Sequence, residues 1–497
     1  MTPFGGMTRF SSGPKVIAAS CLPVLAALLF GSTGLVVVRS AALAAGSQAS
    51  DVGVFQGPVP RAECGPGSRP EPALQGQVTI ADRESGRSSQ GYTCNLEQVG
   101  NYPGEGTQWQ MAWYGHCAYY ATKLAGTQER RGTIVVDVSD PTTPRFSTNL
   151  TSPAMLDPWE SLKVHQARGL LAGVFTAGLE GAGYFDVYDV KGDCAHPKLL
   201  ASVPVNGLGH EGEWAADGLT YYASGTNGGN LTAIDVSDPK APNRISSFFA
   251  SPVTHGFGLS SDGKRLYLAE VNEDYLAAAF LDRGSATDTN GLGIYDIGPI
   301  ADRAPVTRLR RIGKVGWKDG TIGQHAIPIR SKGRPYVVFV DEHGHGGARI
   351  IDVSDETRPR VVSKLKLEIQ MPEHKDLAHE ETRTYRNENG GELPFGYNSH
   401  YCNVDRLYDP TILACSNFES GVRVFDIRDV LAPREIAYFN PGGDGRRRPA
   451  SSGGTTSGYT SAQPRIIPER GEIWFTDHDR GFYVVRFTNG AWPFRAP

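Results

Sequence analysis

A short pattern of apolar and polar positions recurs along the chain. Each copy begins at a glycine, runs through mostly apolar and β-branched residues, and nearly always ends at an aspartate followed by a turn. The clearest copies are GTIVVDVSDP at 132–141, GNLTAIDVSDP at 229–239 and GARIIDVSD at 347–355. Looser copies stand at 183–190, 291–298, 421–427 and 481–487, which makes seven in all. A unit repeated in this way predicts an array of small, similar sheets.

Each copy occupies the third place in a unit of four predicted strands. Four antiparallel strands in meander order form one blade of a β-propeller. The last unit lacks a fourth strand, while residues 93–102 (TCNLEQVGNY) form an unmatched strand ahead of the first unit. We therefore predict an all-β fold, a seven-bladed β-propeller over residues 93–490 with a C-terminal tail at 491–497. The N-terminal strand completes the last blade and closes the ring, which removes two exposed sheet edges.

The aspartates of the repeat have a structural interpretation. An Asp side chain accepts hydrogen bonds from nearby backbone N–H groups, and the following proline fixes the backbone of the turn. We expect this role at four positions, namely Asp137, Asp235, Asp352 and Asp426. They are not expected to act as a carboxylate pair in acid–base chemistry.

The GTIVVDVSDP-type phrases resemble those of the LVIVD-repeat family, and in particular its exported bacterial members. The resemblance covers about residues 93–487 and implies a β-propeller, without a defined activity. Two copies depart from the pattern, because the third has Asp355-Glu356 in place of Asp-Pro and the last has Arg486 in place of the aspartate. These departures put the regularity of the blades in doubt, but not the fold.

The N-terminus has the pattern of a targeting segment. Arg9 and Lys15 precede an apolar run at 16–38, and small residues follow at 41–45. Residues 1–45 are predicted to be a signal peptide or an uncleaved N-terminal anchor, so the protein is expected to be exported, secreted or at the cell surface. Any membrane contact is expected only through this segment. Residues 46–92 are a Gly/Pro-rich extension, expected to wrap around the outside of the propeller or to stay poorly ordered.

Charge and cysteine content narrow the classes of function. The formal net charge of −4 leaves no basic surface typical of nucleic-acid binding, and we expect a monomer. Six cysteines follow the N-terminal segment, an even number that predicts disulfides in an exported protein. Cys402 and Cys415 lie on two strands joined by a turn and are predicted to pair. The pairing of Cys64, Cys94, Cys117 and Cys194 stays open, with Cys117–Cys194 and Cys64–Cys94 suggested by elimination.

A histidine opens most of the repeated units. Measured back from the aspartate of each unit, four of these histidines lie 24 to 27 residues upstream, and His255 lies further away because its unit carries an insertion. The set is His165, His210, His255, His325 and His400, with Gln463 at the equivalent place in the last unit and Gln108 or Gln110 in the first. Because the first strand of a blade lines the central channel, these side chains are predicted to form a ring at the channel mouth.

Acidic and His-bearing loops are predicted to open on the same face. The residues in question are Glu342, His343, His345, Asp477 and His478. Imidazole and carboxylate groups that converge at one place are typical ligands of a transition metal. The five histidines of the ring are therefore candidate ligands of copper, zinc or iron.

Three functions remain open at this point. The first is an exported binding protein that holds an unknown protein or small-molecule ligand on the His- and acid-lined channel face. The second is a metal-dependent enzyme, of redox type, that uses the histidine ring; the third is a passive cell-surface scaffold. A structural role for the histidines is a further alternative, because in WD-repeat propellers a His bonds to a turn Asp of its own blade. No GxSxG, HExxH, Walker-type or GxGxxG motif is present, so we assign no catalytic residue.

Overall fold

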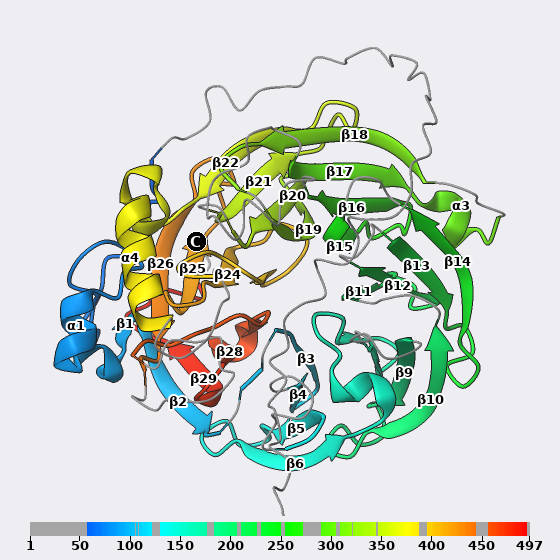
Figure 1. Ribbon diagram of the computed structural model, residues 1–497, viewed down its shortest axis with the longest axis horizontal. Helices are drawn as coiled ribbons and strands as arrows, with labels where there is room; N and C mark the ends of the chain where they lie inside the picture. The colour runs from blue at the N-terminus through cyan, green and yellow to red at the C-terminus, as the bar shows by residue number, and fades with distance from the viewer. Residues whose placement is uncertain are drawn as a thin grey trace, which may run out of the picture. The chain divides into compact units, whose positions relative to one another are not determined.

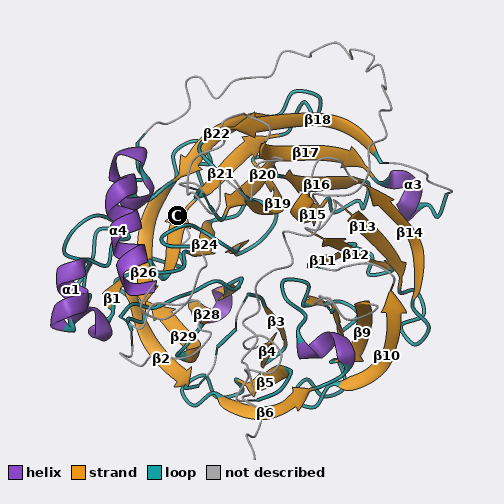
Figure 2. Cartoon of the chain, in the orientation of Figure 1, coloured by secondary structure: helices purple, strands orange, loops and turns teal. Residues whose placement is uncertain are grey.

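The computed structural model describes residues 57–494, except for residues 105, 108, 122–129, 176–182, 206–209, 226–229, 250–253, 272–289, 305–308, 321, 344–345, 387–394 and 444–455. Seven antiparallel sheets surround a central channel, with the first strand of each blade at the centre (Figure 1, Figure 2). This arrangement confirms the predicted seven-bladed, all-β propeller.

The blades follow one another along the chain. Blade 1 holds β3 (Met111–Tyr114), β4 (Cys117–Ala121), β5 (Thr133–Asp137) and β6 (Arg145–Leu150), and blade 2 holds β7 (Lys163–His165), β8 (Leu170–Val174), β9 (Gly183–Asp189) and β10 (Lys198–Val205). Blade 3 holds β11 (Glu211–Trp214), β12 (Thr220–Gly225), β13 (Asn230–Asp235) and β14 (Asn243–Phe249), and blade 4 holds β15 (Thr254–Leu259), β16 (Arg265–Glu270), β17 (Asn290–Asp296) and β18 (Arg310–Trp317).

The remaining blades contain the two N-terminal strands as well. Blade 5 holds β19 (Gly323–Ser331), β20 (Arg334–Asp341), β21 (Ala348–Asp352) and β22 (Arg360–Leu365). Blade 6 holds β23 (Cys402–Val404), β24 (Ile412–Ser416), β25 (Val422–Asp426) and β26 (Arg434–Asn440), with β1 (Tyr92–Cys94) added at its outer edge. Blade 7 holds β27 (Arg465–Ile467), β28 (Glu472–Asp477), β29 (Gly481–Phe487) and β2 (Leu96–Tyr102).

The middle strands of the blades are almost wholly apolar because neighbouring blades cover both of their faces. Every residue of β24 is buried, and four of the five residues of β5 are buried. Where a repeat ends in an aspartate, its side chain fixes the following turn. Asp137 accepts a hydrogen bond of 2.9 Å from the backbone of Ser139, and Asp352 accepts one of the same length from Ser354. The structural interpretation of these aspartates is therefore confirmed.

The ring is closed by the N-terminal strand. β2 pairs with β29, with Leu96 opposite Phe487 and Tyr102 opposite Phe482, so the predicted closure is confirmed. The first two residues of the predicted strand belong instead to β1, which pairs with β26 of blade 6. Asn95 separates the two strands with a left-handed φ of 55°, and this bend moves the chain from one blade to the next.

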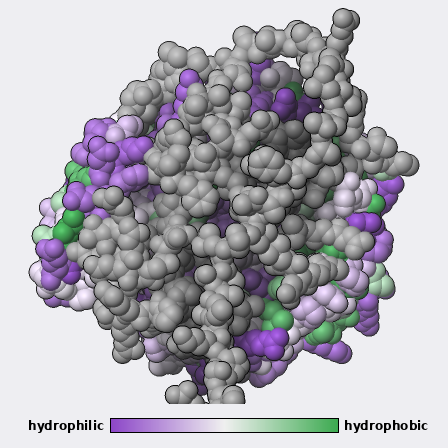
Figure 3. Space-filling model, in the orientation of Figure 1, coloured by the Kyte–Doolittle hydropathy of each residue, from purple (hydrophilic) through white to green (hydrophobic). Residues whose placement is uncertain are grey.

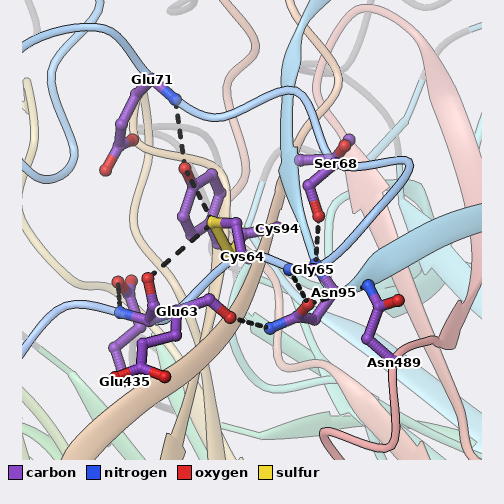
Figure 4. The surroundings of a disulfide bond; sticks show 12 residues. Glu63, Cys64, Gly65, Ser68, Glu71, Cys94, Asn95, Glu435 and Asn489 are labelled. Atoms are coloured by element: carbon purple, nitrogen blue, oxygen red, sulfur yellow. Dashed lines mark hydrogen bonds between the residues drawn. A yellow bond between two sulfur atoms is a disulfide. The ribbon is translucent and has the colours of Figure 1, made fainter.

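Three disulfides are present among the described residues. Cys402 and Cys415 face each other directly across β23 and β24, which confirms the predicted pair. The other two bonds, Cys117–Cys194 and Cys64–Cys94, agree with the pairing suggested by elimination. Figure 4 shows Cys64–Cys94 beside Asn95, whose side-chain amide donates to the carbonyl of Glu63 at 2.9 Å. This disulfide ties the extension to the strand that precedes the ring closure.

Loss of the Cys402–Cys415 disulfide is expected to lower the free energy of unfolding. The bond closes a short loop, with a sequence separation of 13 residues. Removing a cross-link over a loop of this size costs about 3 kcal/mol through the entropy of the unfolded chain. The Cys402→Ala, Cys415→Ala double variant should therefore show a lower midpoint in urea than the unchanged protein. Equal midpoints, with the bond verified by mass spectrometry in the parent, would contradict this expectation.

The extension before the ring packs against blades 5 and 6. It carries α1 (Ile80–Ser85) and the 3-10 turn η1 (Arg87–Gln90), and the backbone of Val59 bonds to Lys366 at 2.8 Å. Glu71 forms a 2.6 Å ion pair with the fully buried Arg423 of β25. The described part of the extension is therefore held by buried charge pairs as well as by its disulfide.

A helix that the sequence did not predict lies between blades 5 and 6. α4 (Lys375–Arg386) is rich in good helix formers but has few apolar residues, so the apolar spacing gave no helical signal. Its described outer surface is hydrophilic (Figure 3). The other short elements are α3 (Gly298–Ala301), η2 (Pro153–Leu156), η3 (Glu368–Gln370), η4 (Pro372–His374) and η6 (Pro468–Arg470). In the described part of the chain, no helix is long and apolar enough to cross a membrane.

Candidate metal centre

Three histidines and two glutamates from five different blades meet at one mouth of the channel. They stand where the innermost strands begin, or in the loop after the second strand of blade 5. The set consists of Glu160, His210, His255, Glu342 and His400. Two groups within it, Glu160–His210–His255 and Glu160–Glu342–His400, each keep one ligand atom per residue within 4.8 Å of the others. We call these five residues the channel-mouth cluster.

Glu160 is the centre of the channel-mouth cluster. One carboxylate oxygen lies 2.7 Å from Nε2 of His210 and 3.4 Å from Nε2 of His255, and the other lies 2.9 Å from Nε2 of His400. Glu342 contacts the same Nε2 of His400 at 3.1 Å and Nδ1 of His255 at 3.7 Å. A single carboxylate thus contacts imidazoles from three blades.

Backbone carbonyls orient two of the imidazole rings. Nδ1 of His255 lies 2.9 Å from the carbonyl oxygen of Gly323, and Nδ1 of His400 lies 2.8 Å from that of Ser461. A carbonyl oxygen only accepts, so each Nδ1 carries the proton and donates it. Nε2 of both rings is therefore directed toward the carboxylates, as in metal sites where an outer hydrogen bond fixes the histidine tautomer.

The charges of the channel-mouth cluster are mutually dependent. Burial lowers the pKa of His255, but Glu342 and Glu160 outweigh burial and raise it to about 9. Burial likewise lowers the pKa of His400, and its contacts with the same two carboxylates raise it to about 10. Burial alone raises the pKa of Glu160, yet His210 and the other two histidines hold it well below its usual value. Without a metal, protonated imidazoles therefore neutralise the carboxylates at neutral pH.

Aromatic side chains enclose the channel-mouth cluster. Trp109 lies 5.4 Å from the His400 ring and 5.2 Å from Trp159, and Phe418 lies 5.0 Å from His400. Nε1 of Trp159 donates to Nε2 of His210 at 3.0 Å. Apolar walls exclude water and strengthen every electrostatic interaction inside them.

The structure brings together only part of the predicted histidine ring. His210, His255 and His400 join the channel-mouth cluster, and Glu342 joins them from its predicted loop. His165 lies at the far end of β7, where its Nε2 is 3.1 Å from the carbonyl of Ala216. β7 begins late in its unit, so that Glu160, rather than His165, stands at the channel mouth.

His325 and the amides lie beside the channel-mouth cluster rather than in it. The His325 ring stacks on Tyr401 at 4.6 Å and its Nε2 lies 3.3 Å from the carbonyl of Cys402. Burial lowers the pKa of His325 to about 3, so this ring is neutral. Gln463 donates to the same carbonyl at 3.2 Å, and its own backbone N–H donates to Gln110. Gln108 lies outside the described residues.

The remaining predicted residues occupy separate places. His343 is buried, with its ring 6.2 Å from that of Phe395. Asp477 accepts a 2.6 Å bond from the backbone of Tyr459, and burial raises its pKa to about 7. His478 packs edge-on against Tyr459 at 5.7 Å. His345 lies outside the described residues.

Sequence reasoning missed Glu160 and its neighbour Trp159. Trp159 has a left-handed φ of 50°, a backbone conformation that bulky residues rarely adopt and that is found preferentially at functional sites. The available signal was positional: Glu160 is an acid just before the first strand of its unit, where the neighbouring unit has His210. A search restricted to histidine could not find it.

Stability of the metal-free protein is expected to fall at alkaline pH. The pKa of both His255 and His400 is raised above the ordinary 6.5, to about 9 and about 10. Their contribution is therefore complete below pH 6.5 and is lost as the pH rises through the folded-state pKa values. The melting temperature of chelator-treated protein should fall steadily between pH 7 and pH 10. In a His255→Phe, His400→Phe variant, the melting temperature should depend less on pH. A midpoint that rises over this range would contradict the assigned charges.

The fold and the channel-mouth cluster define the class of this protein: a seven-bladed β-propeller with a His- and Glu-lined channel mouth. Within that class, residues 129–152 match the LVIVD repeat family. The chain therefore contains a match to this repeat within a seven-bladed β-propeller.

Solved structures give a wider comparison. The chain is similar to a 6-phosphogluconolactonase candidate from Bacteroides uniformis, with 12% identity and a TM-score of 0.49 over 74% of this chain and 89% of that one. It is also similar to the Kuenenia stuttgartiensis hydrazine synthase, with 12% identity and a TM-score of 0.48 over 78% of this chain and 96% of that one. No curated protein matches the sequence.

Proposed function

We propose that this protein binds a divalent first-row transition metal ion at the mouth of its channel. The ligands would come from the channel-mouth cluster of Glu160, His210, His255, Glu342 and His400. One observation carries the proposal: the Nε2 atoms of His210 and His255 lie only 3.0 Å apart. Two imidazole nitrogens that both present lone pairs at this distance repel each other. Only a proton or a metal cation between the rings makes the approach favourable.

Buried atoms without hydrogen bonds support the fit to a cation. Nε2 of His400 and one carboxylate oxygen of Glu160 make no hydrogen bond of acceptable geometry with any described residue, although they face the other ligands. A buried polar atom left without a hydrogen bond costs free energy. A bound metal ion would satisfy both atoms.

The donor set favours some metals over others. Imidazole nitrogen suits zinc, iron and copper. Carboxylate oxygen is a harder ligand, which iron(II) and zinc also bind. The cluster contains no thiolate, the ligand type that selects copper(I). When bound, such an ion supplies a Lewis acid, and iron adds a redox centre. The carbonyls of Gly323 and Ser461 would hold two ligand rings in place, and the aromatic wall would keep bulk water away.

The disulfides support the proposal that the protein is exported. Disulfides persist in oxidising compartments and are rare in the cytosol, and three are present among the described residues. We therefore propose that residues 1–45 direct export, as a cleaved signal or as an anchor. The metal site would then act outside the cytoplasm.

Metal analysis tests this function. Protein prepared from its native compartment without a histidine tag should contain about one metal ion per chain, measured by mass spectrometry of the metals. The His210→Ala, His400→Ala variant should lose most of the metal. The His165→Ala, His196→Ala variant, which removes two histidines outside the channel-mouth cluster, should retain it. Substoichiometric metal in the unchanged protein, or equal metal in the two variants, would overturn the proposal.

A further inference from the structure

A second group of polar side chains lies in the channel next to the channel-mouth cluster, since Glu211 is bridged to Glu160 through the backbone. Glu211 follows the ligand His210 and accepts hydrogen bonds from Gln324, at 3.1 Å, and from the hydroxyl of Tyr401. All three side chains are fully or almost fully buried. We call Glu211, Gln324 and Tyr401 the channel floor.

A cavity of about 960 Å³ lies next to the channel floor, lined by the inner strands of several blades. Its inner end holds Lys163, Glu213 and His325, and its walls there include the apolar side chains of Trp214 and Phe257. The outer part extends between the turns of blades 4 and 5, past Arg330. This volume accommodates a small organic molecule, and pockets of this kind combine apolar walls with a few polar groups that fix orientation.

The ammonium of Lys163 is the least satisfied charge in the cavity. Its side chain is only 11% exposed, and its nearest acid, Glu213, lies 3.8 Å away, beyond hydrogen-bond distance. The Tyr401 ring lies 5.2 Å from it, measured to the ring centre, and the buried carboxylate of Glu211 also attracts it electrostatically. A mostly buried ammonium with three donors and no hydrogen bond is costly, and a carboxylate would complete it.

Glu213 provides the opposite charge on the neighbouring blade. One of its oxygens accepts from the backbone of Trp214 at 2.9 Å, and the other faces Lys163. A separated pair of opposite charges matches a ligand that carries both an ammonium and a carboxylate. The rings of Trp214 and Phe257, which line the same cavity, match an apolar side chain.

We infer that the channel cavity binds a free amino acid with an apolar side chain. Lys163 holds the α-carboxylate, Glu213 holds the α-ammonium, and Trp214 and Phe257 contact the side chain. The channel floor keeps this site separate from the channel-mouth cluster. The inference stands without a metal and therefore does not depend on the function proposed above.

Calorimetric titration of chelator-treated protein with L-leucine tests the inference. We expect saturable binding to the unchanged protein and weaker binding of 4-methylpentanoate and of isoamylamine, which lack the ammonium and the carboxylate respectively. Lys163→Met should weaken leucine binding about tenfold or more, because a charge-assisted hydrogen bond is lost. Arg330→Met, a charge removal in the outer part of the same cavity, should leave it unchanged.

A second variant separates charge recognition from a folding defect. Glu213→Gln should weaken leucine binding while leaving that of 4-methylpentanoate unchanged. The inference is overturned if leucine does not bind the unchanged protein, if Lys163→Met binds it equally well, or if Arg330→Met is the variant that loses binding. Because the protein is metal-free throughout, each of these outcomes is independent of the metal analysis.

Discussion

A Glu160→Gln variant is expected to bind Zn²⁺ about 1000-fold more weakly than the unchanged protein. Glu160 contacts the Nε2 atoms of His210, His255 and His400, so its charge serves every imidazole in the channel-mouth cluster. Removing one partner from a buried set of charges costs about 4 kcal/mol, which corresponds to about three orders of magnitude in affinity. Competition with a chromophoric chelator measures the dissociation constant directly.

Glu213→Gln is the matched control for this variant. Glu213 lines the channel beyond the channel floor and makes no contact with the channel-mouth cluster. Its loss should leave Zn²⁺ affinity unchanged within about threefold, as expected of a substitution remote from the ligands. If the two variants bind Zn²⁺ equally, Glu160 is not a ligand and the proposed centre is wrong.

Zn²⁺ affinity is expected to rise about 100-fold for each pH unit between pH 6 and pH 8. The pKa of His255 is about 9 and that of His400 about 10, so both are protonated in this range. A metal must displace both protons, and each displaced proton contributes about a factor of ten per pH unit. The dependence should weaken as the pH passes about 9 and vanish above about 10.

Proton release gives an independent measurement of the same linkage. Calorimetry in buffers of different ionisation enthalpy should find about two protons released per Zn²⁺ at pH 7. His325→Phe is the control: His325 is already neutral, with a pKa of about 3, and its removal should leave the proton count unchanged. A count near zero in the unchanged protein would show that His255 and His400 are not displaced by metal.

The blades could be predicted from sequence because each contains the same strand and the same turn. The aspartate at 137, 235, 352 or 426 bonds to its own local backbone, and local rules of this kind are visible in a single sequence. α4 could not be predicted, because its helix depends on propensity and on packing against blades 5 and 6 rather than on an apolar stripe. The bend at Asn95 was also hidden, since it is defined by bonds to Glu63 and Ile436, far away in the sequence.

The site was harder to predict than the fold. The spacing from the repeated aspartate predicted which part of each blade lies at the channel mouth. It did not predict which side chain of that part points into the channel. His325 is one residue further along its strand than Gln324, and adjacent residues of a strand point to opposite sides. Glu160 of blade 2 meets its histidine partners from blades 3, 4 and 6 only in the folded ring. Such a convergence of four blades has no signature in local sequence.

The pairing of β2 with β29 has a consequence for how the molecule is made. β2 is synthesised long before its partner β29, so the ring cannot be completed until β29 has been made. Contacts between such distant segments also form slowly. Until then β2 has no partner strand and blade 7 is incomplete. Termination of translation before Gly481 would therefore leave β2 unpaired and the ring of blades open.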